Sequence, residues 1–300
     1  MGKSLLQWFF RKLFWGVLRH LVSDRQYAKL RYRLEQNRPL NLENPERFTE
    51  KIQWIKLYER TERRKIAANR LRVRNYVSNL IGEEHLVPLH TVCDHLTAEV
   101  WELLPDQFVL KANHGCEMVA IVRDKSEADY SAIKKTVTNW STTDYYKISR
   151  EWVYKDLPRK ILAEKLLFDE SGNVPRDFKF FCFNGLVEII QIDFDRYGNQ
   201  KRNLYDRNFN RVEGRLLYPN YEGNVPKPPA LDQAITIAET LSKEFSFVRV
   251  DLYLIADHVY FGELTNYPGN GFIEFQPEQL ELHLGSLLSL PNNKESGSWE

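Results

Sequence analysis

Residues 176–194 constrain the fold of this chain more than any other stretch. They read RDFKFFCFNGLVEIIQIDF, with an apolar and aromatic run on either side of Asn184-Gly185. Asn-Gly is the dipeptide best suited to the two-residue turn of a β-hairpin, because both turn residues need a left-handed backbone. The sequence therefore predicts an antiparallel strand pair, in a register that places Arg176 opposite Asp193.

A second hairpin is expected at residues 248–265. Apolar residues alternate with Arg249 and Asp251 in its first strand, the pattern of a half-buried strand. A three-residue loop at 256–258 would place Asp251 opposite Glu263, whereas a loop of two or four residues would put the two carboxylates on opposite faces. Facing carboxylates need a cation between them, either the Arg249 guanidinium or a Mg²⁺ ion that also binds phosphate. Loop length and cation both stay open.

Helical and strand patterns divide the rest of the chain. Helix-like periodicity is present at residues 24–35, 48–58, 62–81, near 129–140, 228–245 and 277–290. Strand-like runs are present at residues 86–92, 108–112, 118–122, 160–168 and in a further pair within 201–218. Antiparallel strand pairs with helices between them predict the α+β class.

Composition excludes several classes of protein. A chain of 300 residues can bury a sizeable core in one large domain or two ordinary ones. Its net charge of +1 gives no reason to expect a nucleic-acid partner. Cys93, Cys116 and Cys182 are widely spaced and form no CxxC pair, which indicates reduced thiols in a cytoplasmic protein.

The segment at residues 5–22, LLQWFFRKLFWGVLRHLV, is the part of the chain that suggests a membrane. It is too short and too charged to span a bilayer or to act as a signal peptide. On a helical wheel its apolar face consists of Leu6, Phe10, Leu13, Phe14, Val17, Leu18 and Leu21. Trp8 and Trp15 flank that face beside basic residues, as in helices that lie in the membrane interface. The segment either packs on the protein or contacts the inner face of the membrane, and the sequence leaves both open.

A lysine at the end of an apolar strand is the first candidate for binding a ligand. Lys111 closes the run FVLK and is followed by Asn113, His114 and Gly115. An ammonium group beside a glycine-containing loop suits phosphate, because the loop amides and the charge can converge on one anion. An ordinary β-turn explains the same residues, so both interpretations stand.

Asp193-Phe194-Asp195 indicates a different chemistry. Many glycosyltransferases hold a metal–nucleotide-sugar complex with a D-x-D motif, which makes glycosyl transfer an alternative function. The predicted register argues against it, because Arg176 opposite Asp193 would already neutralise that carboxylate. The same register places Asp177 and Lys179 on one face of their strand, as an internal ion pair or as ligand-facing groups.

The order of these signals resembles that of the ATP-grasp superfamily, and most closely its TupA-like branch of teichuronopeptide-biosynthesis proteins. Along the sequence, a lysine at the end of a strand is followed by a small loop, a second strand and a strand that contains Glu-Lys. The motifs R-x-D and E-x-T-x-x-P-G come after them. The blocks that carry the resemblance include NPERFTEKIQWIKLYER, FVLKANHG, EWVYKDLPRKILAEKLL, LSKEFSFVRVDLY and VYFGELTNYPGNGF.

The resemblance implies an ATP-grasp fold, in which two α+β lobes hold a nucleotide between them. The ATP-grasp unit is expected at residues 61–290, with a smaller lobe at about 86–167 and a larger lobe at about 168–290. Residues 1–60 would form a helical extension before it, and residues 291–300 a flexible tail.

The resemblance also implies which residues bind ATP. In ATP-grasp proteins a strand lysine and a mobile loop cover the phosphates, and a hinge strand contacts adenine. The residues expected in these roles are Arg70, Lys111, Asn113, His114, Gly115, Glu164, Lys165, Leu167 and Lys179.

Metal binding and catalysis are implied in the same way. Asp251, Glu263 and Thr265 would hold Mg²⁺ against the ATP phosphates. Arg249 and Lys111 would be the catalytic residues, with Arg249 facing the acyl-phosphate or the substrate carboxylate.

The chain departs from the family pattern at three places. Asn69-Arg70 stands where the branch usually has Asp-Lys, so the charge is kept but the geometry is not. Residues 114–117 read His-Gly-Cys-Glu in place of His-Gly-Ser-Gly, and Thr265 stands where many members have Asn. A catalytically impaired assembly protein is therefore a further alternative.

The function implied by the resemblance is ATP-dependent amide formation. A carboxylate is phosphorylated to an acyl-phosphate, and an amine then displaces the phosphate. The carboxylate would belong to a uronic acid of a surface polysaccharide and the amine to an amino acid. The expected location is the cytoplasm, with residues 5–22 at the inner face of the membrane.

Overall fold

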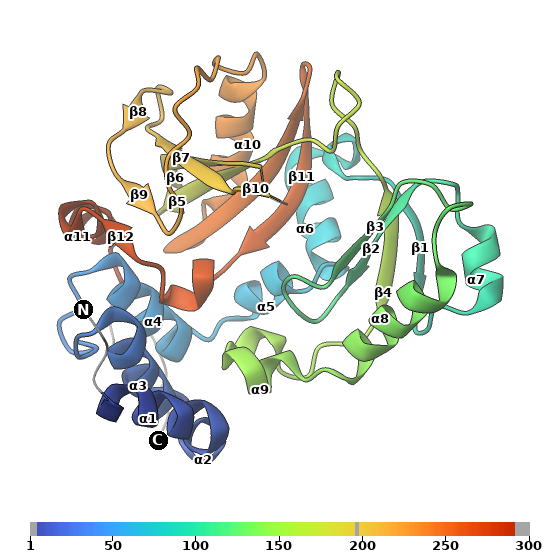
Figure 1. Cartoon of the computed structure of the whole chain (residues 1–300). Helices are drawn as coiled ribbons and strands as arrows, with labels where there is room; N and C mark the ends of the chain where they lie inside the picture. The colour runs from blue at the N-terminus through green and yellow to red at the C-terminus, as the bar shows by residue number, and fades with distance from the viewer. Residues whose placement is uncertain (1–4, 196–197, 292–300) are drawn as a thin grey trace.

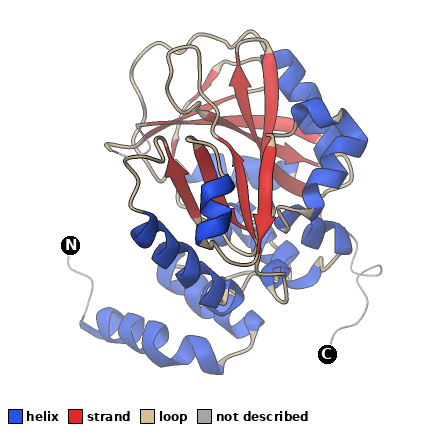
Figure 2. Cartoon of the chain, turned by 90° about the vertical axis from the view of Figure 1, so that its right-hand side faces the viewer, coloured by secondary structure: helices blue, strands red, loops and turns tan. Residues whose placement is uncertain are grey.

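The computed structural model describes residues 5–195 and 198–291, with side chains from Trp8 onward. Two β-sheets lie side by side with helices around them, and the N-terminal helices form a layer below (Figures 1 and 2). Helices combined with antiparallel sheets confirm the predicted α+β class. Apart from its first residue, the tail predicted at 291–300 lies outside the described residues.

The smaller sheet has four antiparallel strands in the order β1-β4-β2-β3. Its strands are β1 (Leu89–Cys93), β2 (Phe108–Ala112), β3 (Val119–Val122) and β4 (Ile161–Lys165). Trp101 of α7 (Ala98–Leu103) and Val137 of α8 (Tyr130–Thr142) join its apolar core. Both helices begin where a side chain, of Thr97 or of Asp129, accepts a hydrogen bond from a first-turn amide.

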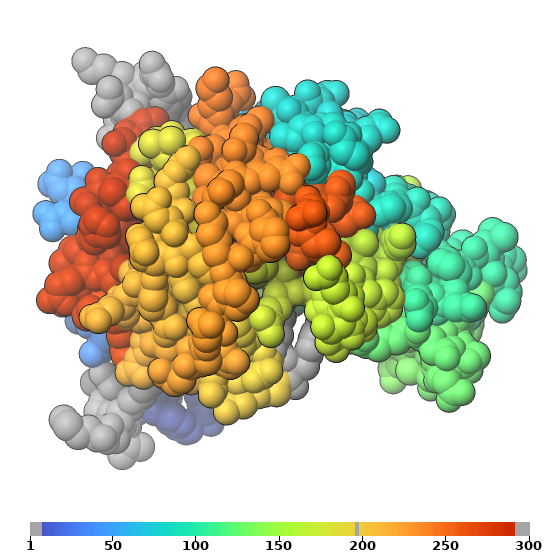
Figure 3. Space-filling view, turned by 90° about the horizontal axis from the view of Figure 1, so that it is seen from above, coloured from blue at the N-terminus to red at the C-terminus, as the bar shows by residue number. Residues whose placement is uncertain are grey.

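The larger sheet has six strands in the order β11-β10-β5-β6-β7-β8. They are β5 (Asp177–Phe183), β6 (Leu186–Phe194), β7 (Lys201–Tyr205), β8 (Arg211–Val212), β10 (Phe247–Ile255) and β11 (His258–Thr265). Figure 3 shows from above how this part of the chain, yellow to orange, meets the green segments of the smaller sheet. The boundaries of the two predicted lobes remain a prediction.

Helices cover both faces of the larger sheet, so β5 is buried along its whole length. On one face pack α10 (Leu231–Ser242) and α6 (Arg72–Ile81). On the other face, the ring of Phe48 in α4 (Phe48–Tyr58) packs at an angle against those of Phe181, Phe183 and Phe247. Two buried faces explain why β5 reads as a nearly continuous apolar run.

Shorter elements connect and flank the two sheets. They are α1 (Leu5–Leu13), η1 (Phe14–Leu18), α2 (Arg19–Leu21), α3 (Asp24–Gln36), α5 (Glu62–Ala68), η2 (Glu83–His85), α9 (Tyr145–Ser149), η3 (Trp152–Tyr154), β9 (Arg215–Leu216), η4 (Pro268–Gly271), β12 (Phe275–Gln276) and α11 (Glu278–Leu287). β9 and β12 pair with each other as a small separate sheet.

The helix predicted at residues 62–81 is two helices, α5 and α6, separated at residues 69–71. The side-chain oxygen of Asn69 accepts hydrogen bonds from the amides of Leu71 and Arg72, at 3.1 and 3.0 Å. This capping competes with helix continuation, which is why a pattern with helical periodicity breaks here. The break leaves Arg70 on a connection that faces the smaller sheet.

The Asn184-Gly185 hairpin forms as predicted, but the register beyond its turn is shifted. Both turn residues have positive φ, at 49° and 84°, and the flanking residues pair directly. A bulge in β6 then displaces the partners by one residue, so that Arg176 does not lie opposite Asp193. The neighbour of Asp193 on the other side is Arg202 of β7, which supplies the cation instead.

In the second hairpin, Asp251 lies opposite Glu263, as the three-residue loop predicted, although the loop has two residues. The expectation that a two-residue loop would separate the carboxylates was wrong because β11 contains a bulge at Gly262. A Cβ atom at Gly262 would lie 2.9 Å from the carbonyl oxygen of Asp251, so the bulge requires glycine. The bulge therefore restores the facing pair.

The apolar face predicted for the N-terminal segment divides into two. Phe14 is fully buried and its ring contacts that of Tyr27 at 5.5 Å between centroids. Leu13, Val17 and Leu21 point outward and are exposed. Among the described residues, no helix is long and apolar enough to cross a bilayer.

Candidate nucleotide and metal site

A cluster of charged side chains lies on β5, β10 and β11 of the larger sheet. Asp251 is 2% exposed, and both of its carboxylate oxygens accept hydrogen bonds from the guanidinium of Arg249, at 2.6 and 2.7 Å. Lys179, directly opposite Asp251 on β5, donates a further bond at 2.8 Å and also pairs with Asp177. The predicted ligand-facing pair of β5 is thus part of one buried network.

One nitrogen of the Arg249 guanidinium, Nη2, donates toward three oxygens. They are Asp251 Oδ2 at 2.7 Å, Thr265 Oγ1 at 3.0 Å and Glu263 Oε1 at 3.4 Å. The three residues predicted to bind Mg²⁺ therefore converge on one point, and a cation lies there. Of the two cations that the sequence left open, Arg249 bridges the carboxylates in this structure.

The donor set fits a magnesium ion that is completed by phosphate. Two carboxylates and a hydroxyl are hard oxygen ligands, and Mg²⁺ commonly binds one or two carboxylates together with phosphate oxygens. The described residues contain no cluster of three or more acidic, histidine or cysteine side chains that would hold a metal alone. Asp251, Glu263 and Thr265 can thus hold the ion only together with further ligands.

The two carboxylates differ in their readiness to accept a metal. Burial raises the pKa of Asp251, and Arg249 and Lys179 counter only part of this effect. Burial also opposes ionisation of Glu263, but Arg70, Arg249 and Lys179 outweigh it and hold the pKa of Glu263 below its usual value. Glu263 is also the more exposed, with 39% of its side chain accessible. It is the carboxylate that an incoming cation meets first.

Lys111 faces the cluster from the smaller sheet. Its ammonium lies 2.6 Å from Glu164 on the neighbouring strand β4, and Arg74 of α6 lies 3.4 Å from the other oxygen of that carboxylate. Burial alone would lower the pKa of Lys111, but Glu164 and Tyr253 raise it, so the group stays charged. Two cations around one acid leave positive charge for a phosphate.

Arg70 joins the two sheets across the groove. Its guanidinium donates to the carbonyl oxygens of Ala112 and Gly115, the latter at 2.6 Å, and lies 3.7 Å from Glu263. The loop after β2 and the carboxylate of β11 are therefore linked through a single side chain. Arg keeps the charge of the usual lysine and adds a planar fork that can reach both partners.

These side chains line a groove between the sheets that is almost filled. Its free volume is about 20 Å³, and its walls include Arg70, Arg74, Lys111, Glu164 and Glu263. A nucleotide needs far more room, since small-molecule sites in proteins typically enclose about 300–1,000 Å³. Binding therefore requires the two sheets, or these side chains, to move apart.

The loop residues after Lys111 are not aimed at the groove. Asn113 is buried and bonds the carbonyl of Pro158 and the amide of Leu71, at 3.0 and 3.2 Å. His114 bonds the carbonyl of Trp140 and lines a different pocket. Of the predicted loop ligands, Gly115 touches the groove, through its bond with Arg70.

The remaining predicted residues lie at the end of β4. Lys165 closes this strand, is exposed, and its amide bonds the carbonyl of Pro88 at 2.9 Å. Leu167 follows in the connection to β5 and is half-buried. Their contact with adenine stays a prediction.

The D-x-D motif does not form a metal site. Asp193 is buried and its carboxylate is satisfied by Arg202 and by Gln191, which donates at 3.1 and 3.2 Å. Asp195 is exposed and has a left-handed backbone with φ of 49°, beyond the end of β6. A cross-strand cation neutralises Asp193, as the sequence predicted, although it comes from a different strand.

Sequence reasoning missed two contributors to the site. Arg74 was not singled out, because nothing in the sequence distinguishes it from the neighbouring arginines at positions 70 and 72. The bridging role of Arg70 was also missed, because it depends on the break at Asn69. Asn69 is a residue type that commonly caps a helix, and this could have suggested the break.

Two antiparallel sheets that face each other across a lysine, paired arginines and a carboxylate hairpin define an ATP-grasp protein. The chain belongs to the TupA-like ATP-grasp family, whose sequence model matches residues 50–289. No curated protein sequence matches it.

Solved structures of ATP-grasp ligases are similar at low identity. D-alanine–D-alanine ligase from Bacillus anthracis, complexed with ATP, is 15% identical with a TM-score of 0.39, and the match covers 67% of this chain and 55% of that one. N5-carboxyaminoimidazole ribonucleotide synthetase from Thermus thermophilus is 13% identical with a TM-score of 0.39, covering 89% and 59%. The ligase PsnB, complexed with a precursor variant, Mg and ADP, is 9% identical with a TM-score of 0.42, covering 93% and 73%. The chain thus spans little more than half of the first of these proteins.

Replacing Glu263 by Gln removes the accessible ligand while keeping its shape, so we expect magnesium-dependent stabilisation by ATP to disappear. In the wild type, ligand at a hundredfold over Kd should stabilise the fold by about 2.7 kcal/mol, visible as a raised melting temperature. The measurement is thermal unfolding with ATP in Mg²⁺ and in EDTA. Glu213→Gln, at an exposed carboxylate away from the groove, is the control. A full magnesium effect in Glu263→Gln would contradict the assignment.

Proposed function

We propose that this protein is an ATP-dependent ligase that joins an amino acid to the carboxylate of a uronic acid in a surface polysaccharide. The observation that carries the ligase chemistry is the convergence of Asp251, Glu263 and Thr265 on one cationic point, across the groove from Lys111. Support for the uronic acid comes from the TupA-like family. The sequence resembles the branch of that family that is typified by teichuronopeptide-biosynthesis proteins.

The reaction takes place in two steps. The acceptor carboxylate takes the γ-phosphoryl group of ATP, which leaves ADP and an acyl-phosphate. The amine nitrogen of the amino acid then attacks the acyl carbon, phosphate departs with the bonding electrons, and the amine loses a proton. The products are an amide, ADP and inorganic phosphate.

The protein contributes charge and position to both steps. Magnesium, when bound, neutralises the phosphate oxygens. Lys111 and Arg70 place positive charge on either side of the groove, where the phosphoryl group is negative. Arg249, once released by the carboxylates, is free to bind the acyl-phosphate or the acceptor carboxylate.

Exclusion of water is the other requirement, since an exposed acyl-phosphate hydrolyses. Arg70 holds the carbonyls of Ala112 and Gly115 and so ties the loop after β2 to the groove. Because the groove is almost closed in this structure, we infer that the loop and the smaller sheet open to admit ATP and close again over it.

The direct test uses the full chain with ATP, Mg²⁺, an oligomer of uronic acid and pools of amino acids. We expect ADP and phosphate in equal amounts only when acceptor and amine are both present. Lys111→Ala should lower kcat by about a hundredfold or more, since it removes a charge aimed at the transferring group.

The control for this test is Asp195→Ala, which should leave turnover close to that of the wild type. Consumption of a nucleotide sugar that is lost in Asp195→Ala would favour glycosyl transfer instead. If no pair of acceptor and amino acid gives ADP, the result would favour the alternative of a catalytically impaired assembly protein.

We further propose that the N-terminal helices rest on an anionic membrane surface. Phe9, Leu13, Val17 and Leu21 follow one another at intervals of four residues and are 39–75% exposed. Lys12 lies beside this stripe with its ammonium 4.0 Å above the ring of Trp8, and residues 5–22 contain no acid. An exposed apolar stripe bordered by tryptophan and cations fits the interface of an anionic bilayer.

Vesicle sedimentation tests this second proposal. The wild type should pellet with phosphatidylcholine vesicles that contain phosphatidylglycerol and much less with phosphatidylcholine alone. Val17→Ser combined with Leu21→Ser should weaken binding by about tenfold or more, because two apolar side chains no longer enter the bilayer.

Leu103→Ser with Leu217→Ser is the matched control, since both leucines are exposed elsewhere on the surface. Membrane contact would be contradicted if both double variants lost vesicle binding equally or if the wild type did not pellet with vesicles. A dimer held together through the apolar stripe would also contradict it.

A further inference from the structure

The turn that follows the metal hairpin has no role in the chemistry described so far. It is η4 (Pro268–Gly271), and it comes shortly after Thr265, the last residue of β11. Because β11 is the edge strand of the larger sheet, only β10 pairs with it there. Arg64 of α5 fixes Asn266 through bonds of 3.1 and 3.0 Å, and the turn continues from that residue. Whatever holds the turn therefore also helps to hold the end of the metal hairpin.

Three consecutive residues of this turn have a left-handed backbone. Their φ angles are 53° at Gly269, 58° at Asn270 and 70° at Gly271. A left-handed residue other than glycine is uncommon and persists where the surrounding structure fixes it. A Cβ atom at Gly271 would lie 2.6 Å from Nε2 of Gln53, so α4 packs directly against the turn. The conformation of the turn thus depends on its neighbours.

Helix α4 holds the middle of the turn. Gln53 donates to the carbonyl oxygens of Asn270 and Gly271, at 2.8 and 2.9 Å. The ammonium of Lys56 is buried and lies 2.6 Å from Oδ1 of Asn270. Both the backbone and the side chain of Asn270 are therefore fixed from α4.

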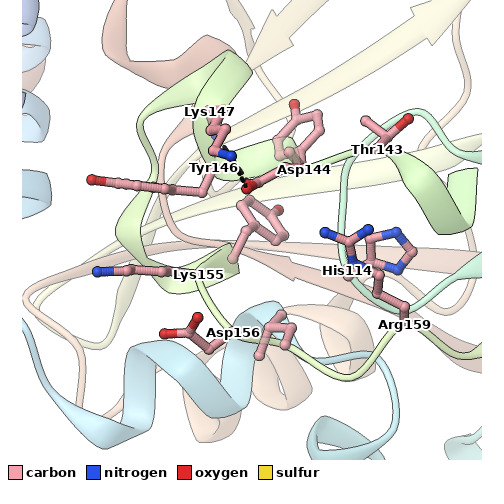
Figure 4. Close-up of a pocket in the computed structure, with 11 residues that line it drawn as sticks. His114, Thr143, Asp144, Tyr146, Lys147, Lys155, Asp156 and Arg159 are labelled. Carbon is pink, nitrogen blue, oxygen red and sulfur yellow. Dashed lines mark hydrogen bonds and ion pairs between the residues drawn. The ribbon is translucent and has the colours of Figure 1, made fainter. Parts of the chain in front are cut away.

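The same asparagine connects the turn to α9. Its side-chain amide donates to the carbonyl oxygen of Ser149, the last residue of α9, at 2.7 Å. The first residues of α9 line a pocket of about 370 Å³ beside His114, whose Nδ1 is buried without a hydrogen-bond partner among the described residues (Figure 4). The turn is thus joined to the segment that surrounds this pocket.

Helix α3 holds the residues that leave the turn. Gln36, at the end of α3, donates to the carbonyl oxygens of Phe272 and Ile273, at 2.8 and 3.3 Å. The guanidinium carbon of Arg31 lies 4.2 Å from the centre of the Phe272 ring and 5.2 Å from that of the Trp15 ring. A cation at this distance from an aromatic face is attracted to it.

The aromatic rings are the main partners of Arg31. Its Nη1 donates to the hydroxyl of Tyr27 at 3.1 Å, and its Nε is buried without a hydrogen-bond partner among the described residues. Arg31 also forms no ion pair in the part of the chain that the structure describes. Its charge is therefore directed at Phe272 and Trp15. Arg31 and Gln36 both precede residues 50–289, the region that the family model matches.

We propose that Arg31 and Gln36 are positioning residues of the metal site, which act through Phe272 to hold the turn that keeps the end of β11 in place. If the turn is free to adopt other conformations, the apparent affinity for the metal–nucleotide complex falls with the fraction of molecules that stay competent. Helix α3 is then part of the site, although it lies outside the family match. This proposal rests on the proposed binding of Mg-ATP at the groove.

The experiment measures binding of Mg-ATP to the full chain by calorimetry. Arg31→Leu keeps an apolar contact with the Phe272 ring and removes the cation, so it should weaken binding by about fivefold or more. Gln36→Ala should weaken binding as well, because two carbonyl oxygens lose their donor. The matched control is Arg33→Leu, which removes the same charge from an exposed position of α3 and should change nothing.

A double-mutant cycle tests whether Arg31 acts through Phe272. Arg31→Leu combined with Phe272→Leu should bind Mg-ATP no more weakly than the weaker of the two single variants, since both remove one interaction. The melting temperature without ligand is recorded for every variant and separates lost stability from lost affinity. Gln36→Ala does not touch the Phe272 ring, so it answers the question even if Phe272→Leu fails to fold.

Additive losses in the cycle would overturn the proposal. Unchanged Mg-ATP affinity in Arg31→Leu and Gln36→Ala would also overturn it, whatever happens to their melting temperatures. If the wild type does not bind Mg-ATP, the metal site itself fails and the positioning role fails with it. The two failures are distinguishable, because the wild type binds Mg-ATP in the first case and not in the second.

Discussion

The ion pairs of Asp251 with Arg249 and Lys179, buried between β5 and β10, are the constraint on which the rest of the structure depends. Charges taken out of water are costly unless each is paired and hydrogen-bonded. Asp251 meets this condition with bonds of 2.6 to 2.8 Å from both cations. The facing strand must then present Glu263 and Thr265 to the same guanidinium, which the bulge at Gly262 achieves.

This arrangement places a guanidinium at the point where we propose that the metal binds. The guanidinium of Arg249 lies where the oxygens of three residues converge, so it neutralises both carboxylates. The proposed metal ion would have to displace that guanidinium, which would then pair with another anion, such as a phosphate or a substrate carboxylate. Metal and nucleotide are thus expected to bind together, since either alone leaves a buried charge without a partner.

The sequence predicted the pairing of strands better than it predicted what lies between them. Alternation and the Asn184-Gly185 turn indicated both hairpins, while the facing of Asp251 and Glu263 was one of two registers that the sequence left open. Bulges escaped prediction because one extra residue reverses a register without any change in hydrophobic pattern. They account for the misplaced partner of Asp193 and for the wrong expectation that a two-residue loop separates Asp251 from Glu263.

Contacts between distant segments were also beyond the sequence. Arg70 reaches the loop after β2 only because Asn69 ends a helix that the periodicity extends through. The pocket beside His114 is lined by short segments between residues 143 and 159, and these segments are too short to show a periodic pattern of apolar residues. His114 stood out as a loop residue, but its orphaned nitrogen follows from the position of Trp140, which no motif encodes.

We expect metal and nucleotide to bind together and to displace the guanidinium of Arg249 from the carboxylates. The most direct measurement is electron paramagnetic resonance of Mn²⁺, used in place of Mg²⁺, titrated with the full chain in the presence and absence of ATP. Mn²⁺ should stay free without nucleotide and become tightly bound when ATP is present. Tight binding of Mn²⁺ to the chain alone, or no protein-bound signal with ATP, would contradict it.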